Sequence, residues 1–199
     1  MGLISNGTTI FDNGAMASGF SGDLTFISSA TASASATIEF TSGIDSTYKE
    51  YVFYCINMHP ASNDVRFQFN LSTNGGSTYA VTKTTTNFIA FHNEADTDAG
   101  LQYQGGSDLS QSTGYQDLTE GIGNSNDDSC SGYLHLFNPS STTFVKHFIT
   151  NFNKSAGTGY SVNSYAAGYG NTTSAINAVS FKMASGNTDA GTIYMFGVN

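Results

Sequence analysis

Alternation of apolar and polar residues is the feature that most limits what this chain can fold into. In residues 64–71, D-V-R-F-Q-F-N-L, every second residue is apolar. The apolar residues are Val65, Phe67, Phe69 and Leu71. Because successive side chains of a strand point to opposite faces, this pattern predicts a half-buried strand. Residues 51–58, Y-V-F-Y-C-I-N-M, are apolar on both faces and predict a central strand that is covered on both sides.

The same pattern recurs along the chain, and helical periodicity is nearly absent. Further strands are predicted at 23–28, 34–41, 79–91, 132–138, 143–152, 160–166, 176–184 and 191–198. About ten strands separated by Gly, Asn, Ser and Asp clusters, without intervening helices, are typical of a sandwich or jelly roll. The low share of charged residues, 11%, and the 15 Phe and 11 Tyr suit short strands with polar turns. We therefore expect an all-β, antiparallel β-sandwich that is jelly-roll-like.

The chain length of 199 residues suits one domain with a sizeable core. Residues 1–22 are rich in Gly and Asn and are expected to form an extended N-terminal arm. Residues 23–199 are expected to form the single sandwich domain, with a long polar loop region near 93–131. Long loops in compact domains are often functional or pack on a neighbour.

Three turns are predicted to join neighbouring strands. The stretch N-L-S-T-N-G-G-S-T-Y, residues 70–79, lacks the lysine and the following helix of a phosphate-binding loop. Its Asn and Gly residues accept positive φ and predict a hairpin. A turn at His59–Asn63 is expected to place 52–58 beside 64–71, and a bulged turn at Ser185–Gly191 to close a hairpin at the end of the chain.

The charge balance excludes two classes of partner. The net charge is −9, and the six bases are scattered along the sequence. A protein without a basic patch has nothing to neutralise nucleic-acid phosphates or an anionic membrane. No apolar run approaches the roughly 18 residues that span a bilayer. The N-terminal M-G-L-I-S-N does not resemble a signal peptide, so we expect a protein made in a cytoplasm.

Candidates for metal binding are few. Asp96 and Asp98, in H-N-E-A-D-T-D-A-G (92–100), are a weak calcium candidate, because alternate oxygens open a calcium loop. The acid that should close such a loop is missing, and a solvated acidic loop is the alternative. His135 and His147 lie in neighbouring predicted strands and could face each other, but no third ligand is indicated.

No catalytic residue or cofactor is predicted, and we expect the protein not to be an enzyme. There is no G-x-S-x-G elbow, and Cys55 lies inside a strand pattern. A bridge between Cys55 and Cys130 stays open, although reduced thiols are expected in a cytosol. A sandwich-fold glycan hydrolase also stays open, because a fold does not decide a function.

Three stretches carry a resemblance to a known class of protein. They are the opening G-L-I-S-N-G-T-T-I-F-D-N-G, residues 51–79, and residues 175–198. Together they resemble small structural proteins of tailed bacteriophages, especially marine ones. M-H-P-A (58–61) and S-G-N…G-T-I-Y…G (185–197) are the most specific parts. The resemblance implies a jelly-roll sandwich that serves as a capsid decoration, or as a tail-fibre or adhesin domain, and it implies no catalytic residues.

The expected function is that of a capsid decoration or cement protein in a virion. Its partners would be the major capsid protein and copies of itself, as a homotrimer, with the arm reaching across neighbouring subunits. The arm's apolar residues would dock into grooves, and these residues are Leu3, Ile4, Ile10 and Phe11.

The alternative is a tail-fibre or receptor-binding protein. In that case the 93–131 loops would carry recognition, and tyrosine rings could stack on a host-surface glycan. The candidate rings are Tyr103, Tyr115 and Tyr133.

Overall fold

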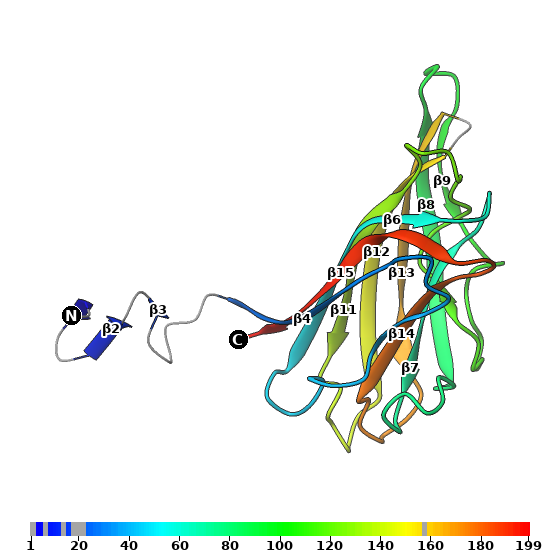
Figure 1. Ribbon diagram of the computed structural model, residues 1–199. Helices are drawn as coiled ribbons and strands as arrows, with labels where there is room; N and C mark the ends of the chain where they lie inside the picture. Colours follow the sequence, from blue (N-terminus) through cyan, green and yellow to red (C-terminus); the bar gives the residue numbers. More distant parts are fainter. Residues whose placement is uncertain (1–2, 6–7, 13–14, 17–22, 157–158) are drawn as a thin grey trace.

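The computed structural model describes residues 3–5, 8–12, 15–16, 23–156 and 159–199. Two antiparallel sheets enclose one core (Figure 1). The larger sheet has eight strands in the order β4-β15-β6-β11-β12-β13-β8-β9. In that order they are β4 (Leu24–Thr31), β15 (Thr188–Val198), β6 (Glu50–Pro60), β11 (Cys130–Phe137), β12 (Lys146–Ala156), β13 (Tyr160–Gly170), β8 (Lys83–Asn93) and β9 (Ala99–Tyr103).

The smaller sheet has four strands in the order β10-β7-β14-β5. They are β10 (Gln116–Asp117), β7 (Phe67–Ser72), β14 (Ala178–Met183) and β5 (Ile38–Phe40). A third sheet of three short strands lies to one side of the sandwich in Figure 1. Its strands are β1 (Leu3–Ser5), β2 (Thr8–Asp12) and β3 (Ala15–Met16).

The prediction of an all-β, antiparallel sandwich is confirmed, and the described residues include no helix. The two main sheets hold eight and four strands, twelve in all, against the expected ten or so. The jelly-roll part of the prediction is not confirmed by this strand order. The region 93–131 was expected to be loop, but β9 and β10 lie within it. Every residue of β9 is exposed, so no buried face marked it as a strand in the sequence.

Turns lie at the three predicted places, but two of them are shorter than predicted, because β6 runs to Pro60 and β15 (Thr188–Val198) begins at Thr188. The pairing predicted around the turns is wrong. β6 and β7 lie in different sheets, and so do β7 and β8, and β14 and β15. Each turn therefore carries the chain from one sheet to the other rather than closing a hairpin. Gly75, Gly76 and Gly186 have the expected positive φ values of 69°, 87° and 69°. Positive φ is a local property that both kinds of connection use, so it could not distinguish them.

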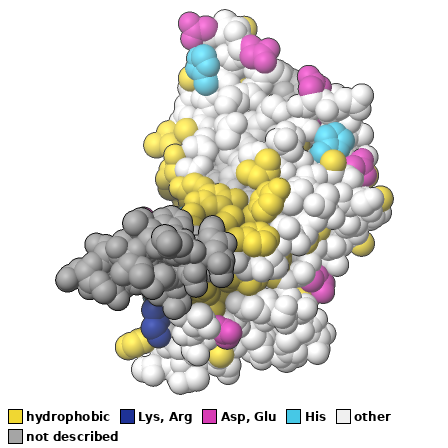
Figure 2. Space-filling model, turned by 60° about the vertical axis from the view of Figure 1, so that its left-hand side comes forward, with side chains coloured by type: hydrophobic (Ala, Val, Ile, Leu, Met, Phe, Trp, Pro, Cys, Tyr) yellow, Lys and Arg dark blue, Asp and Glu magenta, His cyan; other side chains and the backbone are white. Residues whose placement is uncertain are grey.

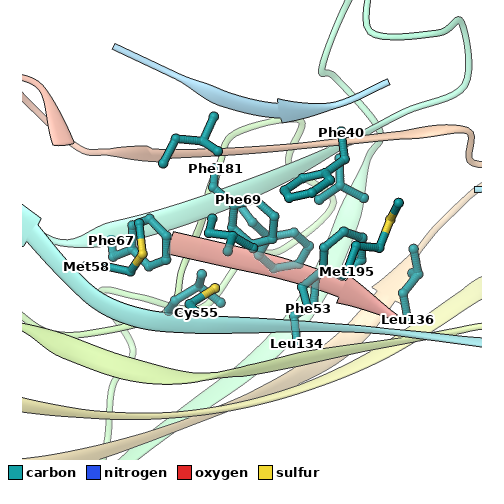
Figure 3. Close-up of a cluster of buried hydrophobic side chains, with 14 of the residues drawn as sticks. Phe40, Phe53, Cys55, Met58, Phe67, Phe69, Leu134, Leu136, Phe181 and Met195 are labelled. Atoms are coloured by element: carbon teal, nitrogen blue, oxygen red, sulfur yellow. The ribbon is translucent and has the colours of Figure 1, made fainter. Parts of the chain in front are cut away.

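A cluster of phenylalanine rings forms the centre of the core (Figure 3). The ring of Phe181 on β14 lies between 5.6 and 6.4 Å, centroid to centroid, from four neighbouring rings. These neighbours are Phe40, Phe53, Phe67 and Phe69. The apolar face predicted for 64–71 is confirmed, since all four of its apolar residues are buried. Burying one such ring contributes about 1.5–3 kcal/mol to folding.

Three lysine side chains are also buried, those of Lys83, Lys146 and Lys154. Their Nζ atoms donate hydrogen bonds to backbone carbonyls. Lys83 donates to the carbonyl of Val81 at 2.9 Å, Lys146 to the carbonyl of Phe144 at 2.6 Å, and Lys154 to the carbonyl of Gly121. Burial lowers the pKa of all three amines, and that of Lys83 to about 7. Because half of the six bases are buried, the surface is even poorer in positive charge than the sequence suggests.

Candidate assembly surface

The outer face of the eight-stranded sheet carries a row of aromatic side chains, which we call the aromatic row. On β6, Phe53 and Cys55 face the core, so Tyr54 between them faces outward. Tyr54 lies opposite Tyr133 of β11 and Tyr194 of β15 in the strand register. The row consists of Phe26, Phe196, Tyr54, Tyr133, His135 and Phe137.

The rings of the aromatic row contact one another in sequence across four strands. Phe26 of β4 packs on Phe196 at 5.7 Å, and Phe196 packs on Tyr54 at 5.8 Å. Tyr54 is 6.4 Å from Tyr133, which is 5.0 Å from His135. Most of these contacts are edge-to-face, the geometry that ring quadrupoles favour. The contacts between rings therefore hold the row in one arrangement. The row is also accessible to a partner, since Phe26 is 56% exposed.

A hollow of about 530 Å³ continues this surface toward β12, β13 and β8. Ala167 lies opposite Ile149 and Thr86 in the register and gives the hollow a short side chain at its base. His147 and Tyr169, whose rings are 6.1 Å apart, line one part of it. Ile149 is 49% exposed there. Beyond the hollow, Phe88 and Tyr165 stack in parallel at 4.9 Å.

Charge is scarce across this face. Within the eight strands the acids are Glu50 and Asp189, both near strand ends, and the lysines are the three buried ones. Glu50 is paired with Nδ1 of His135, which lies between Tyr133 and Phe137 in the aromatic row. Figure 2 shows apolar side chains gathered in one area, with the visible acidic and histidine side chains around its margins. An apolar patch poor in charge is suited to contact with another protein surface.

The predicted calcium ligands do not converge. Asp96 Oδ1 lies 3.0 Å from His92 Nε2, and Asp98 Oδ2 accepts a hydrogen bond from the Tyr160 hydroxyl at 2.9 Å. Within the described ranges, no group of three or more His, Cys, Asp or Glu residues is placed to hold a metal ion. Calcium binding at Asp96 and Asp98 stays a prediction.

The predicted docking residues of the arm are placed by their backbone only. Leu3 and Ile4 belong to β1, Ile10 and Phe11 belong to β2, and Leu3 lies opposite Phe11. The side chains of these residues lie outside the described part of the chain.

The predicted histidine pair is not formed as expected. In the register His135 lies opposite Ile149 and not opposite His147. The three tyrosines predicted to stack on a glycan do not gather either. Tyr103 donates to Asp108 at 2.5 Å, Tyr115 lies under Lys182 with its ring centroid 4.6 Å from Nζ, and only Tyr133 belongs to the aromatic row.

Cys55 and Cys130 carry free, buried thiols. They lie on the neighbouring strands β6 and β11, and burial raises the pKa of both. A buried thiol with a raised pKa is a poor nucleophile, so neither residue is suited to thiol catalysis.

The aromatic row is the feature that the sequence did not predict. Residues 51–58 were expected to be covered on both sides, and for the described residues this holds only in part. β6 is central, between β15 and β11, and Val52 on its outer face is 1% exposed, whereas Ile56 on the same face is 42% exposed. The alternation of Tyr54 and Ile56 with core residues could have indicated that β6 has an exposed apolar face. It could not have indicated that side chains from four strands form one row on that face.

Comparison with protein-family models, with curated proteins and with solved structures finds no match. Over the described ranges, the chain has no helix with the length and apolar character needed to cross a membrane.

Proposed function

We propose that this protein is a bacteriophage virion structural protein, which attaches to the outer shell of the capsid as a decoration or cement protein. The aromatic row on the outer face of the eight-stranded sheet is the observation that carries the proposal. The sequence resemblance of residues 51–79 and 175–198 to phage structural proteins supports the same role. The role is structural and not catalytic.

The aromatic row suits attachment to a shell for a simple energetic reason. Burying apolar surface contributes about 25 cal/mol per Å², before the cost of ordering the partners. Aromatic side chains dominate the binding energy of many interfaces, and here their packing on one another has already restricted their motion. On a capsid lattice, many weak contacts of this kind add up through multivalency.

The other partners in the proposal are copies of the same chain, as a homotrimer. β1, β2 and β3 form a small sheet of their own, which lies beside the sandwich in Figure 1. An arm with its own strands is suited to reach a neighbouring subunit, and its apolar residues would supply the contact.

A double substitution in the aromatic row tests the proposal. Tyr54→Ser with Phe196→Ser removes two rings whose centroids are 5.8 Å apart, on neighbouring strands. We expect purified variant to lose most of its binding to capsids that lack the protein, as measured by co-sedimentation. Capsids decorated with the unchanged protein should resist heat and urea better than bare capsids.

Phe144→Ser is the matched control, because Phe144 is 68% exposed and lies outside the aromatic row. This variant should bind as the unchanged protein does. Equal binding by the double variant, with its fold intact by circular dichroism, would contradict the proposed surface. Absence of binding to any capsid by the unchanged protein would contradict the decoration role itself.

A receptor-binding role is the second candidate, and the edge strand β9 is the observation that favours it. Leu101 and Tyr103 are 74% and 55% exposed on this strand. Exposed aromatic and apolar side chains at a sheet edge can contact a glycan or a peptide strand. Binding of purified protein to host cells, lost in Tyr103→Ser and absent for an unrelated control protein, would favour this role over decoration.

A further inference from the structure

Lys83 and Asn70 make a contact that the proposed function does not use. Lys83 opens β8 in the larger sheet, and Asn70 lies in β7 of the smaller one. Both residues are 0% exposed. Lys83 Nζ lies 2.5 Å from Asn70 Oδ1. An amine and a carboxamide are thus held in contact between the two sheets, away from solvent.

The carboxamide of Asn70 has a fixed orientation. Its Nδ2 donates to the carbonyl of Tyr79 at 2.7 Å and to the carbonyl of Thr113 at 3.0 Å. Its Oδ1 accepts from the backbone N–H of Leu71 at 2.9 Å as well as from Lys83. The carbonyl group therefore faces the lysine, and the Leu71 N–H, which stays in place when Nζ turns its lone pair toward Cγ, draws electron density away from Cγ.

The amine of Lys83 is in an environment that favours its uncharged form. Nζ has two acceptors, Asn70 Oδ1 and the carbonyl of Val81, and a neutral amine has two N–H groups to give them. Burial lowers the pKa of this amine to about 7. A neutral amine keeps a lone pair and is a nucleophile, whereas an ammonium ion is not.

We propose that Lys83 and Asn70 condense into an intramolecular isopeptide bond. The lone pair of Nζ attacks Cγ of Asn70, and a bond forms between Nζ and Cγ. The bond between Cγ and Nδ2 breaks, Nδ2 takes its electron pair and one proton from Nζ, and ammonia leaves. No oxidation or reduction takes place, and no other reactant is required.

This bond would join the two sheets covalently. Residues 73–82 carry the chain between β7 and β8, so the bond would close a short loop across that connection. Among the described residues, no carboxylate is hydrogen-bonded to either group to speed the reaction. Condensation in the folded protein is therefore slow, and its extent increases with time after folding.

Intact-mass spectrometry of the full chain tests the proposal directly. The mass should fall by that of one ammonia molecule as the purified protein is incubated at neutral pH. The protein is then denatured and digested with trypsin, which cleaves after a free lysine. Without the bond, cleavage after Arg66, Lys83 and Lys146 releases 67–83 and 84–146 as separate peptides. With the bond, cleavage after Lys83 is blocked and one peptide, 67–146, appears.

The tryptic map also distinguishes an isopeptide bond from a succinimide at Asn70, which loses ammonia too. A succinimide leaves Lys83 free, so trypsin still cleaves there. The Lys83→Met variant should lose no ammonia during the incubation. The Lys146→Met variant should still lose one ammonia molecule, because the Lys146 amine donates hydrogen bonds only to backbone carbonyls in this structure. Full mass after prolonged incubation of the unchanged protein, or cleavage at Lys83 in the lighter species, would overturn the proposal whatever the variants do.

Discussion

At the scale of single residues, Phe181 should contribute most to stability among the core rings. It is buried and contacts four other phenylalanine rings. Phe181→Ala should lower the free energy of unfolding by about 3–5 kcal/mol, because it removes the ring and leaves a cavity. Urea denaturation followed by circular dichroism measures this. Phe144→Ala, at an exposed site, should change it by less than about 0.5 kcal/mol, and equal losses would contradict the core assignment.

The two thiols give a second prediction at this scale. Because Cys55 and Cys130 are buried and burial raises their pKa, they should react with a thiol reagent only after the protein opens. The rate in native protein should be at least about a thousandfold below the rate in denaturant. The denatured chain should yield two reactive thiols. A yield of none would instead reveal the Cys55–Cys130 bridge that the sequence left open.

At the scale of strands, the sequence predicted which face of a strand is buried better than it predicted which strands pair with each other. Alternation placed Phe67, Phe69 and Leu71 correctly in the core, because a strand needs one buried face whatever lies beside it. It placed Asn70 on the polar face, but the carbonyls of Tyr79 and Thr113 enclose that side chain. Burial by a distant segment depends on the whole fold and leaves no trace in the local pattern.

The candidate surface was beyond the reach of the sequence for the same reason. The aromatic row draws its residues from β4, β15, β6 and β11, which follow one another in the sheet but not in the chain. Each ring alone is an ordinary strand residue. Only the strand order brings Phe26 beside Phe196 and Tyr54 beside Tyr133. That order depends on which turns carry the chain from one sheet to the other, and the sequence did not distinguish those turns from hairpins.

The bulge between β15 and β6 gives a prediction for a single element. Gly191 has a φ of +115°, and a Cβ atom there would lie 2.7 Å from the carbonyl oxygen of Asn57. The strand register shifts on both sides of Ala190, next to this glycine. Gly191→Ala should therefore cost more than about 1 kcal/mol of unfolding free energy. The comparison is Gly106→Ala, where a Cβ would meet nothing within 4 Å, and a thermal melt of both variants should separate them.

At the scale of the whole molecule, charge and apolar surface act against each other. The chain has a net charge of −9, so copies repel at low salt, whereas the aromatic row favours contact. Salt screens the repulsion and does not weaken apolar burial. Self-association should therefore tighten, by about fivefold, between about 0.05 M and about 0.5 M sodium chloride. Sedimentation equilibrium of the full chain measures the association constant at each concentration.

The direction of the salt effect identifies the forces that hold the copies together. Ion pairs across an interface would weaken as salt rises, because screening acts on attraction as it does on repulsion. An association constant that falls with salt would therefore assign the contact to charged loops such as 93–131, and not to the aromatic row. The Tyr54→Ser, Phe196→Ser variant tests the contribution of the aromatic row to this association. It keeps the net charge of −9 and the N-terminal arm, so its copies should repel as before, and only the part of the association that depends on the aromatic row should be lost at both salt concentrations.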